Sequence, residues 1–430
     1  MDKLKLSRRG FVKTAAPAPF FIRHLLSAPP ASKLRLASFG AGGMAFLTLD
    51  GIATHPNVTL VCAAEVDSAR LNQLKAKYPD TRVYEDWRRM LDRERKNLDL
   101  ACVGTPDHMH APMALSAMRM GLPVYVQKPL AHDIHEVRTL TEYGRRKGLV
   151  TQMGIQIHSY REYRTAVKLI QDGAIGKVTE VHSWSEKKWG DSEPLPTRSD
   201  KPPASLNWDQ WLGVAEPRPY LEGYYHPVNW RKRITFGTAT FGDMGCHILD
   251  PVFGALRLSA PVSVRSEGAA PNHDNWALDS TIRYSFPGGL KLTWYDGDRR
   301  PPAEIQALIG SQKLPGQGSI LVGSQGTMLL PHVGMPVLLP EEKFRDFQIP
   351  PFERSNHYWQ FADAVAGKDK ASAGFDYAGP LTETVLLGPI ATHFPNTTLE
   401  WDARRMRFDQ HEATALVHGH YRRGWKVKGL

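Results

Sequence analysis

Cysteine is scarce in this chain of 430 residues, which contains only Cys62, Cys102 and Cys246. The count is odd, the three residues lie far apart, and no C-x-x-C pair occurs. This pattern provides neither a disulfide framework nor the ligand spacing of a structural zinc site. Cys62 and Cys102 fall in apolar, strand-like runs, where a free cysteine is usually a small buried hydrophobic residue. We therefore predict unpaired, buried thiols and no metal.

Long apolar runs are also missing. The stretch 14–26 is interrupted by two prolines and by Arg23-His24, so it is too short and too polar to span a bilayer. Before it, residues 7–13 read Ser-Arg-Arg-Gly-Phe-Val-Lys and resemble the twin-arginine export signal, with Ala28 or Ala31 preceding a cleavage site. The sequence thus predicts export of the folded protein, for example to the periplasm. The alternative is a cytoplasmic protein with a disordered basic tail.

A surplus of charge is absent from most of the chain, although the net charge is +10. Residues 1–35 hold eight basic residues against one acidic residue, and residues 404–430 hold seven against two, which leaves the body close to −2. A body near neutrality offers no surface that follows a phosphate backbone. We therefore expect no nucleic-acid partner, despite the basic pI.

A glycine-rich turn between a strand and a helix is the clearest positive signal. The run 34–39 leads into Gly40-Ala41-Gly42-Gly43-Met44-Ala45, a G-x-G-x-x-A pattern that cradles a dinucleotide pyrophosphate. Gly40 permits the tight turn, and Gly42 lets backbone N–H groups approach the phosphates. Glu65, about 20 to 25 residues further on, ends a second apolar strand, where a carboxylate binds ribose hydroxyls and repels a 2′-phosphate. The sequence predicts NAD rather than NADP; a plain turn with a solvated Glu65 is the alternative.

Strand-like and helix-like segments alternate from residue 33 to about 150, which predicts a parallel sheet with helices on its faces. The expected strands are Leu34–Phe39, Thr59–Ala64, Leu98–Val103 and Pro123–Gln127, and the expected helices follow the glycine turn or lie near Ser68–Lys77, Trp87–Arg93, Ala111–Met120 and Ile134–Lys147.

After residue 155 the strands become longer and alternate in polarity. Thr281–Phe286 and Leu290–Tyr295 predict one hairpin, and Ser319–Val322 with Thr327–Leu330 predict a second. Antiparallel hairpins indicate an α+β second domain. The segment 187–225 is rich in proline, tryptophan and charge and predicts long loops over a site.

Three segments carry candidate chemistry. The first, Thr105-Pro106-Asp107-His108-Met109-His110, follows a parallel strand, where ligands of such sheets bind, and should touch the nicotinamide half of the cofactor. A metal pair formed by its two histidines is disfavoured, because no third ligand stands at a suitable spacing.

The second segment ends a buried strand with Lys128-Pro129, where a lysine can hydrogen-bond a substrate oxygen or share its proton. The third contains Asp243 and His247, which share one face if they lie on a helix, with histidine as base and aspartate as its partner. Alone, each has a plainer interpretation: a solvated loop lysine, and a surface pair or helix cap.

Taken together and in order, these motifs resemble the Gfo/Idh/MocA superfamily of NAD(P)-dependent sugar and polyol oxidoreductases, over essentially the whole chain after residue 33. The resemblance implies a Rossmann domain at 33–155 and, at 156–430, an α+β substrate and oligomerisation domain with a large open, mostly antiparallel sheet. It also implies a homo-oligomer formed through that sheet.

The resemblance assigns roles to individual residues. Lys128, Asp243 and His247 fall on the family's catalytic positions, although the usual E-K-P motif here has Gln127, which removes a charge beside the lysine. The expected cofactor contacts are Gly40, Gly42, Gly43, Met44, Glu65, Thr105, Pro106, Asp107, His108, His110, Lys128, Trp230 and Arg231. The expected substrate contacts are Gln156, His158, Arg231, Asp243 and His247.

Export outside the cytoplasm would separate an NAD enzyme from the cell's NAD, so it favours a tightly held cofactor that is reduced and reoxidised within one cycle. The leading interpretation is an oxidoreductase acting on a secondary alcohol of a sugar, polyol or glycoside. A redox-neutral NAD-dependent glycosidase is a second, although such relatives often carry tyrosine at the position of Asp243 and lack the Lys-Pro pair. A non-catalytic binding protein that retains its cofactor is a third.

Overall fold

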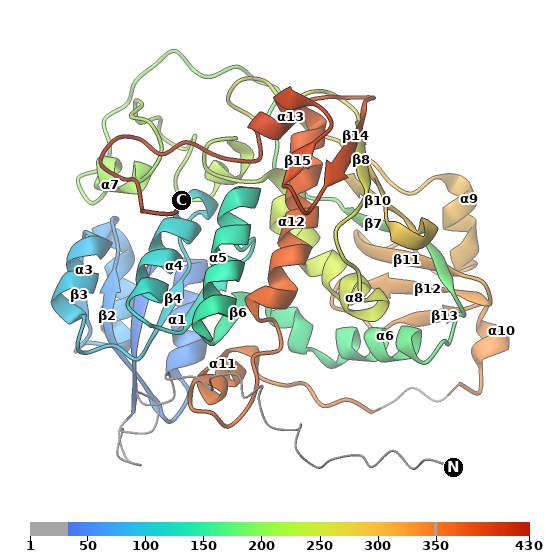
Figure 1. Ribbon diagram of the computed structural model, residues 1–430, viewed down its shortest axis with the longest axis horizontal. Helices are drawn as coiled ribbons and strands as arrows, with labels where there is room; N and C mark the ends of the chain where they lie inside the picture. The colour runs from blue at the N-terminus through green and yellow to red at the C-terminus, as the bar shows by residue number, and fades with distance from the viewer. Residues whose placement is uncertain (1–32, 348–350) are drawn as a thin grey trace, which may run out of the picture. The chain divides into compact units, whose positions relative to one another are not determined.

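The computed structural model describes residues 33–347 and 351–430 (Figure 1). The twin-arginine-like segment lies outside these residues. Within the described part of the chain, no helix has both the length and the apolar character needed to cross a membrane. All three cysteines are free and buried, as predicted.

The first sheet has six parallel strands in the order β3-β2-β1-β4-β5-β6. This is the Rossmann order, and it reverses direction between β1 and β4, where the carboxyl ends of the strands open a crevice for ligands. The strands are β1 (Leu34–Phe39), β2 (Val58–Ala64), β3 (Arg82–Tyr84), β4 (Leu100–Val103), β5 (Val124–Gln127) and β6 (Thr151–Gly154).

The helices of this region match the sequence predictions closely. They are α1 (Met44–Ala53), α2 (Leu71–Lys77), α3 (Trp87–Glu94), α4 (His110–Arg119) and α5 (Ile134–Lys147). Asp133 and Glu136 form a capping box at the start of α5, and Gly148 ends that helix in the left-handed conformation. Strand β3 was not predicted, because it is three residues long and mostly exposed.

The second sheet has nine strands in the order β13-β12-β11-β7-β10-β9-β8-β14-β15, and all its neighbouring pairs are antiparallel except β7 with β10. Both predicted hairpins form: Tyr284 faces Leu292, and Ser319 faces Leu330. The predicted fold class is therefore confirmed. The strands are β7 (Val178–Ser185), β8 (Ser263–Glu267), β9 (Thr281–Ser285), β10 (Lys291–Asp296), β11 (Gln317–Gly323), β12 (Gly326–Pro331), β13 (Val337–Leu339), β14 (Thr398–Asp402) and β15 (Arg407–Phe408).

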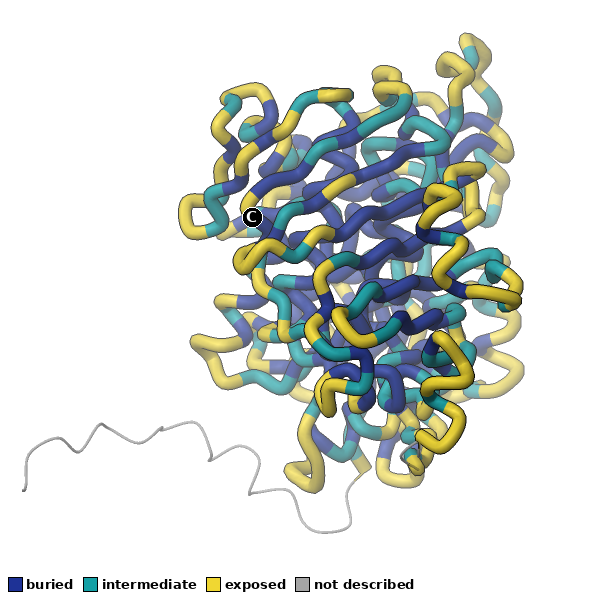
Figure 2. Tube along the Cα trace, turned by 90° about the vertical axis from the view of Figure 1, so that its right-hand side faces the viewer, coloured by how far each residue is buried: buried dark blue, intermediate teal, exposed yellow. Residues whose placement is uncertain are grey.

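Helices line the inner face of this second sheet. Figure 1 shows α12 between the two sheets, with α8 and α6 beside it. Phe241 stacks on Trp294 of β10 with ring centroids 4.5 Å apart, so the sheet face is part of the main core. Figure 2 shows the buried strands in dark blue and the exposed residues gathered in turns. The helices are α6 (Arg161–Gln171), α7 (Trp208–Leu212), α8 (Cys246–Leu256), α9 (Ala303–Gln306), α10 (Glu341–Phe344), α11 (His357–Val365), α12 (Phe375–Thr392) and α13 (His411–Ala415).

One helix from late in the chain returns to the first sheet. Helix α11 packs against α1, and its Phe361 ring lies 5.7 Å from the ring of Tyr125 on β5. A hydrophobic cluster therefore joins Leu36, Tyr125 and Phe361 in one core. The domain boundary at residue 155 stays a prediction. Helix α11 follows that boundary in the sequence but packs with the Rossmann sheet.

Candidate active site

The glycine turn after β1 forms a cradle at the N-terminus of α1. Gly40 has a φ of 93°, which glycine adopts without strain. A Cβ on Gly104, which follows β4, would lie 2.6 Å from the Cα of Ala45, so only glycine lets α1 approach β4 this closely. Within the described residues, the backbone amides of Gly42, Gly43 and Met44 have no hydrogen-bond acceptor. These three N–H groups suit the oxygens of a pyrophosphate.

Glu65 lies at the carboxyl end of β2, next to this turn. Its carboxylate accepts hydrogen bonds from the amides of Ala41, at 2.8 Å, and Asp67, at 3.0 Å. Burial raises the pKa of Glu65, while the two amide donors oppose that effect. The carboxylate thus stands beside the phosphate cradle at the position that holds a ribose. The residues present fit the adenosine and pyrophosphate parts of NAD.

The loop after β4 is occupied mainly with contacts inside the protein. Asp107 accepts a hydrogen bond from Thr238 at 2.8 Å, and burial raises the pKa of Asp107 to about 6. The two nitrogens of His110 each lie 2.8 Å from a carbonyl oxygen, those of Thr105 and Pro129. His108 lies 3.3 Å from the Trp211 carbonyl oxygen. The histidines therefore hold the loop in place, and direct contact of this loop with the cofactor stays a prediction.

Metal binding by these histidines finds no support in the described residues, which contain no cluster of three or more histidine, cysteine or acidic side chains suited to a metal ion.

Lys128 and Asp243 come together, although 115 residues separate them. The ammonium of Lys128 donates to one carboxylate oxygen of Asp243 and to the Asp243 backbone carbonyl, both at 2.7 Å. The Lys128–Pro129 peptide is cis. Gln127 donates to the Thr48 hydroxyl of α1 at 2.8 Å, so it does not replace the family's glutamate as a partner of the lysine.

Three further donors surround the same carboxylate. Trp189 donates to Asp243 at 2.8 Å, and Lys187 and Arg231 each lie 3.3 Å from it. Burial alone would raise the pKa of the Asp243 carboxyl, but the cations Lys128, Arg231 and Lys187 hold that pKa well below its usual range. The carboxylate is therefore charged at every physiological pH.

Lys187 and Trp189 were not among the predicted site residues. They begin the long loop segment that the sequence placed over a site, but a lysine and a tryptophan in a polar loop carry no motif that singles them out. Arg231 was predicted, and its guanidinium lies 4.3 Å from the ring of Trp230 and 5.5 Å from that of Trp189.

His247 lies four residues beyond Asp243, but the pair spans two kinds of helix. Asp243 lies in a π-helical turn (Phe241–Gly245), and His247 is the second residue of the regular helix α8. Burial, together with nearby Lys128, lowers the pKa of His247 well below its usual value. Its Nδ1 is buried without a hydrogen-bond partner within the described part of the chain. The imidazole is therefore neutral, and one of its ring nitrogens is unpaired.

A second histidine, which the sequence did not single out, lies beside it. The ring of His332 is centred 6.0 Å from that of His247, and its Nδ1 pairs with the Tyr163 hydroxyl at 2.8 Å.

Gln156 and His158, the other predicted substrate contacts, lie in a short helical turn after β6. His158 pairs with the buried Asp250 at 2.8 Å. Burial lowers the pKa of His158, but the Asp250 carboxylate outweighs burial, so the pKa is raised. The Oε1 of Gln156 is buried without a partner in the residues described. No hydrogen bond in this part of the chain links either residue to Lys128 or Asp243, so their role toward a substrate stays a prediction.

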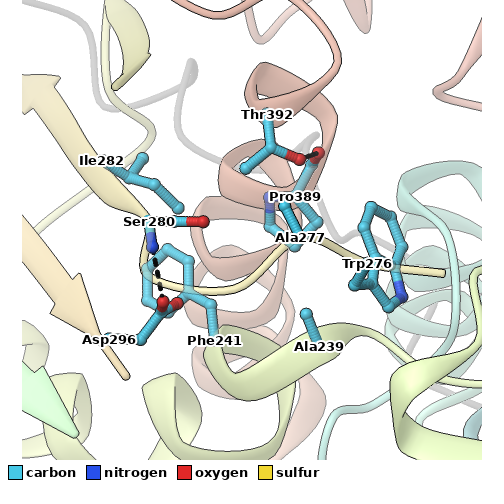
Figure 3. A pocket seen from close by; sticks show the side chains of 9 residues that line it. All are labelled: Ala239, Phe241, Trp276, Ala277, Ser280, Ile282, Asp296, Pro389 and Thr392. Atoms are coloured by element: carbon cyan, nitrogen blue, oxygen red, sulfur yellow. Dashed lines mark hydrogen bonds between the residues drawn. The ribbon is translucent and has the colours of Figure 1, made fainter. Parts of the chain in front are cut away.

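A small cavity is lined by Phe241, which lies in the π-helical turn, and by Asp296 (Figure 3). Its volume of about 10 Å³ admits roughly one water molecule. Asp296 accepts hydrogen bonds from the Ser280 amide at 2.7 Å and from Trp294 at 3.1 Å, and burial raises its pKa to about 7. This cavity is too small for a sugar or a nicotinamide.

Curated relatives match only part of this chain. A dTDP-3,4-didehydro-2,6-dideoxy-alpha-D-glucose 3-reductase of Streptomyces antibioticus is 29% identical over 35% of this chain and 46% of its own length. The scyllo-inositol 2-dehydrogenase (NAD(+)) of Bacillus subtilis is 26% identical over 34% and 42%. An alpha-N-acetylgalactosaminidase of Shewanella oneidensis is 26% identical over 36% and 35%. Each match therefore covers less than half of the relative.

Solved structures match the fold over most of the chain. The WlbA dehydrogenase of Chromobacterium violaceum, solved with NADH and UDP-GlcNAcA, has a TM-score of 0.63 at 14% identity and covers 87% of this chain and 98% of its own. GenD2 from gentamicin A biosynthesis, solved with NAD, has a TM-score of 0.56 at 17% identity and the same coverage.

Family comparisons cover both sheets. Residues 34–155 match the NAD-binding Rossmann fold of the oxidoreductase family, and residues 165–427 match that family's C-terminal alpha/beta domain. With the glycine cradle, Glu65 and the Lys128–Asp243 pair in place, the chain belongs to the Gfo/Idh/MocA family of NAD-binding oxidoreductases.

Proposed function

We propose that this protein oxidises or reduces a secondary alcohol of a sugar, polyol or glycoside and keeps its NAD through turnover. The observation that carries the proposal is the buried group of Lys128, Asp243 and His247, in which an ammonium and a neutral imidazole stand near one another beside the carboxyl ends of the Rossmann strands. NAD, when bound, accepts the hydride that leaves the carbinol carbon.

The chain's own residues would handle the proton and the oxygen. Two hydrogen bonds to Asp243 fix the Lys128 ammonium, which has a third N–H to donate to the substrate oxygen. As the carbinol carbon loses hydride, that oxygen loses its proton, and neutral His247 is the base that takes it. The carbon–oxygen bond becomes a carbonyl. Asp243 orients the Lys128 ammonium, so Lys128 stabilises the developing negative charge on oxygen.

Retention of NAD is supported by a strap, residues 198–236, that crosses the end of β2. The backbone of Asn207 donates to the Val66 carbonyl at 2.9 Å, and Ser68 donates to Ser205 at 2.8 Å. His226 lies 3.0 Å from the Asp67 carboxylate. These contacts begin one residue after Glu65, so the strap flanks the place where a ribose would lie.

The C-terminal segment also contacts the strap. Arg422 donates to the Gly213 carbonyl at 2.6 Å and pairs with Asp209 at 2.7 Å. Within the strap, Trp211 packs on Phe236 with ring centroids 5.0 Å apart. A segment held by several such contacts opens slowly, which supports slow release of the cofactor.

The glycosidase alternative draws on the curated relatives that carry glycosidase names. The Lys128–Asp243 pair favours dehydrogenase chemistry, because the glycosidase relatives often carry tyrosine at the position of Asp243 and lack the Lys-Pro pair. A binding protein without turnover is the remaining alternative, and it gives no reason for a neutral base beside a fixed ammonium.

The test uses the purified full chain with no added NAD. Mass spectrometry of the denatured protein should find bound NAD, and incubation with sugars, polyols and glycosides should produce NADH absorbance or an oxidised product. Turnover beyond one equivalent per site shows that the hydride returns within the cycle, whereas one burst of NADH shows that an external acceptor is needed. Glycoside cleavage without net oxidation would favour the glycosidase, and retained NAD with no reaction the binding protein.

Export remains part of the proposal and has its own test. Residues 1–35 are fused to a reporter that requires export in the folded state, with Arg8→Lys and Arg9→Lys together as the control. Export of the parent fusion alone supports the twin-arginine route. Retention of both fusions would support a cytoplasmic dehydrogenase that draws on the cell's NAD.

A further inference from the structure

The carboxylate of Asp243 is surrounded by more positive charge than it can neutralise. Lys128, Lys187 and Arg231 all lie within ion-pair distance of it. Within the described residues, Lys187 and Arg231 have no other acidic partner at that distance. Three cations therefore share one carboxylate, and burying unpaired charge is costly.

Lys187 and Arg231 also have hydrogen-bond donors to spare. Lys128 makes its contacts at 2.7 Å, whereas Lys187 and Arg231 approach the carboxylate only to 3.3 Å. Lys187 uses one of its three N–H groups. Arg231 uses Nε toward Asp243 and one terminal nitrogen toward the Val228 carbonyl, at 3.4 Å, and its other terminal nitrogen contacts no acceptor in the part of the chain described. One terminal nitrogen of the Arg231 guanidinium and two N–H groups of the Lys187 ammonium therefore remain available to a ligand.

The neighbouring groups supply only part of the missing negative charge. His247 and His332 are neutral, because burial lowers the pKa of each, that of His332 to about 4. Asp107, whose pKa burial raises to about 6, is charged at neutral pH and offsets part of the cation surplus, but within the described residues it forms no ion pair with any of the three cations. The buried Nδ1 of His247 is unpaired in the same place. This cluster therefore has unused donors and one unused acceptor, which points to a polar ligand.

The cluster is open at Lys187. The Lys187 side chain is 42% exposed, against 12% for Lys128 and 19% for Arg231. A ligand would therefore meet Lys187 first and Lys128 last.

We infer that the substrate is a sugar acid, a polyhydroxy carboxylate of the uronic or aldonic type, whose carboxylate binds Lys187 and Arg231 while its reacting hydroxyl faces Lys128 and His247. This inference rests on the proposed function. The free terminal nitrogen of Arg231 and the Lys187 ammonium can each donate a charge-assisted hydrogen bond to one oxygen of a carboxylate. The charge of that group balances the cation surplus and orients the sugar, and Lys187 thereby determines specificity.

The test measures binding by tryptophan fluorescence, since Trp189 and Trp230 flank Arg231. The full chain loaded with NAD is titrated with D-glucuronate, D-galacturonate and D-gluconate, each against its neutral counterpart D-glucose, D-galactose or D-glucitol. At least one acid should bind about tenfold more tightly than its counterpart. Lys187→Met should weaken that acid about tenfold and leave its neutral counterpart unchanged.

Lys188→Met is the matched control, because this substitution removes the same charge from the adjacent position. Unlike Lys187, Lys188 pairs with the exposed Asp298. It should leave both affinities unchanged. Neutral sugars that bind as tightly as the acids, equal loss of both in Lys187→Met, or tighter binding of glucose 6-phosphate than of every acid would each overturn the inference.

A separate readout of NADH absorbance distinguishes the two proposals. Neutral sugars that are oxidised without any preference for acids would leave the proposed function standing and remove this inference. An acid that binds through Lys187 but never yields NADH or an oxidised product would support the inference and count against the dehydrogenase.

Discussion

The two ends of the proposed cofactor site are built in different ways. The phosphate and ribose end uses the turn 40–45 and Glu65, which lie within one β-α-β unit and meet through neighbouring parallel strands. The reaction end takes Lys128, Lys187, Arg231 and Asp243 from four separated segments and both sheets. A local unit places backbone N–H groups, whereas only packing between distant segments places side chains around one buried charge.

Removing a side chain from the reaction end should have the largest effect. Lys128→Ala and His247→Ala should each lower turnover by a factor on the order of 10² to 10⁴, as expected for a lost acid–base or oxygen contact. NAD content should stay unchanged in both variants, because the cradle lies at the other end. Steady-state rates with a reactive sugar and mass spectrometry of bound NAD measure the two properties; near-parent rates would remove the assigned roles.

A buried carboxylate without cations sharpens the contrast with Asp243. Burial raises the pKa of Asp296 to about 7. Between about pH 4 and pH 7 the unfolded chain therefore loses a proton that the folded chain keeps, and the folded state loses stability as pH rises through that window. The parent should lose free energy of unfolding as pH rises from 4 to 8, and Asp296→Asn should lose about 3 kcal/mol less over the same range.

Denaturant unfolding at both pH values measures this difference, with Asp298→Asn as an exposed control. A constant difference between Asp296→Asn and the parent would show that Asp296 is not protonated in the folded protein.

A methyl group where α1 crosses β4 should disturb the phosphate and ribose end of the cofactor site and leave the reaction end unchanged. Gly104→Ala places a Cβ 2.6 Å from the Ala45 backbone, so the helix must shift and carry its N–H groups with it. Overpacking of this kind costs about 1 to 3 kcal/mol, so we expect NAD affinity to fall roughly tenfold or more. Gly254→Ala, where a Cβ would make ordinary contacts at 3.4 Å, is the control. Unchanged affinity in Gly104→Ala would refute the close-approach argument.

The smallest effect should come from Glu65. We expect the parent to bind NADH more tightly than NADPH, and Glu65→Ser to narrow that gap by roughly tenfold, because it removes the repulsion of a 2′-phosphate. Glu65→Gln isolates the charge while keeping the size of the side chain. Fluorescence titration with both cofactors measures the ratio, and tighter NADPH binding by the parent would contradict the assignment.

The sequence predicted most of the first sheet because parallel strands that are buried on both faces are continuous apolar runs. A helix from about Ile134 to Lys147 was predicted, and α5 has these bounds; its capping box and its final glycine are local signals. The return of α11 to the Rossmann core could not be predicted, because an amphipathic helix does not specify which distant sheet it will cover.

By itself, the sequence determined the dinucleotide cradle, its ribose carboxylate and the order of the two sheets. Each follows from backbone freedom, hydrophobic period and neighbouring strands. The tertiary structure alone decided that Lys187 and Trp189 meet Asp243, that His332 lies beside His247 and that a strap crosses the end of β2. These contacts depend on how two sheets and a long loop pack together. The packing energy is distributed over the whole core, so no single sequence motif specifies it.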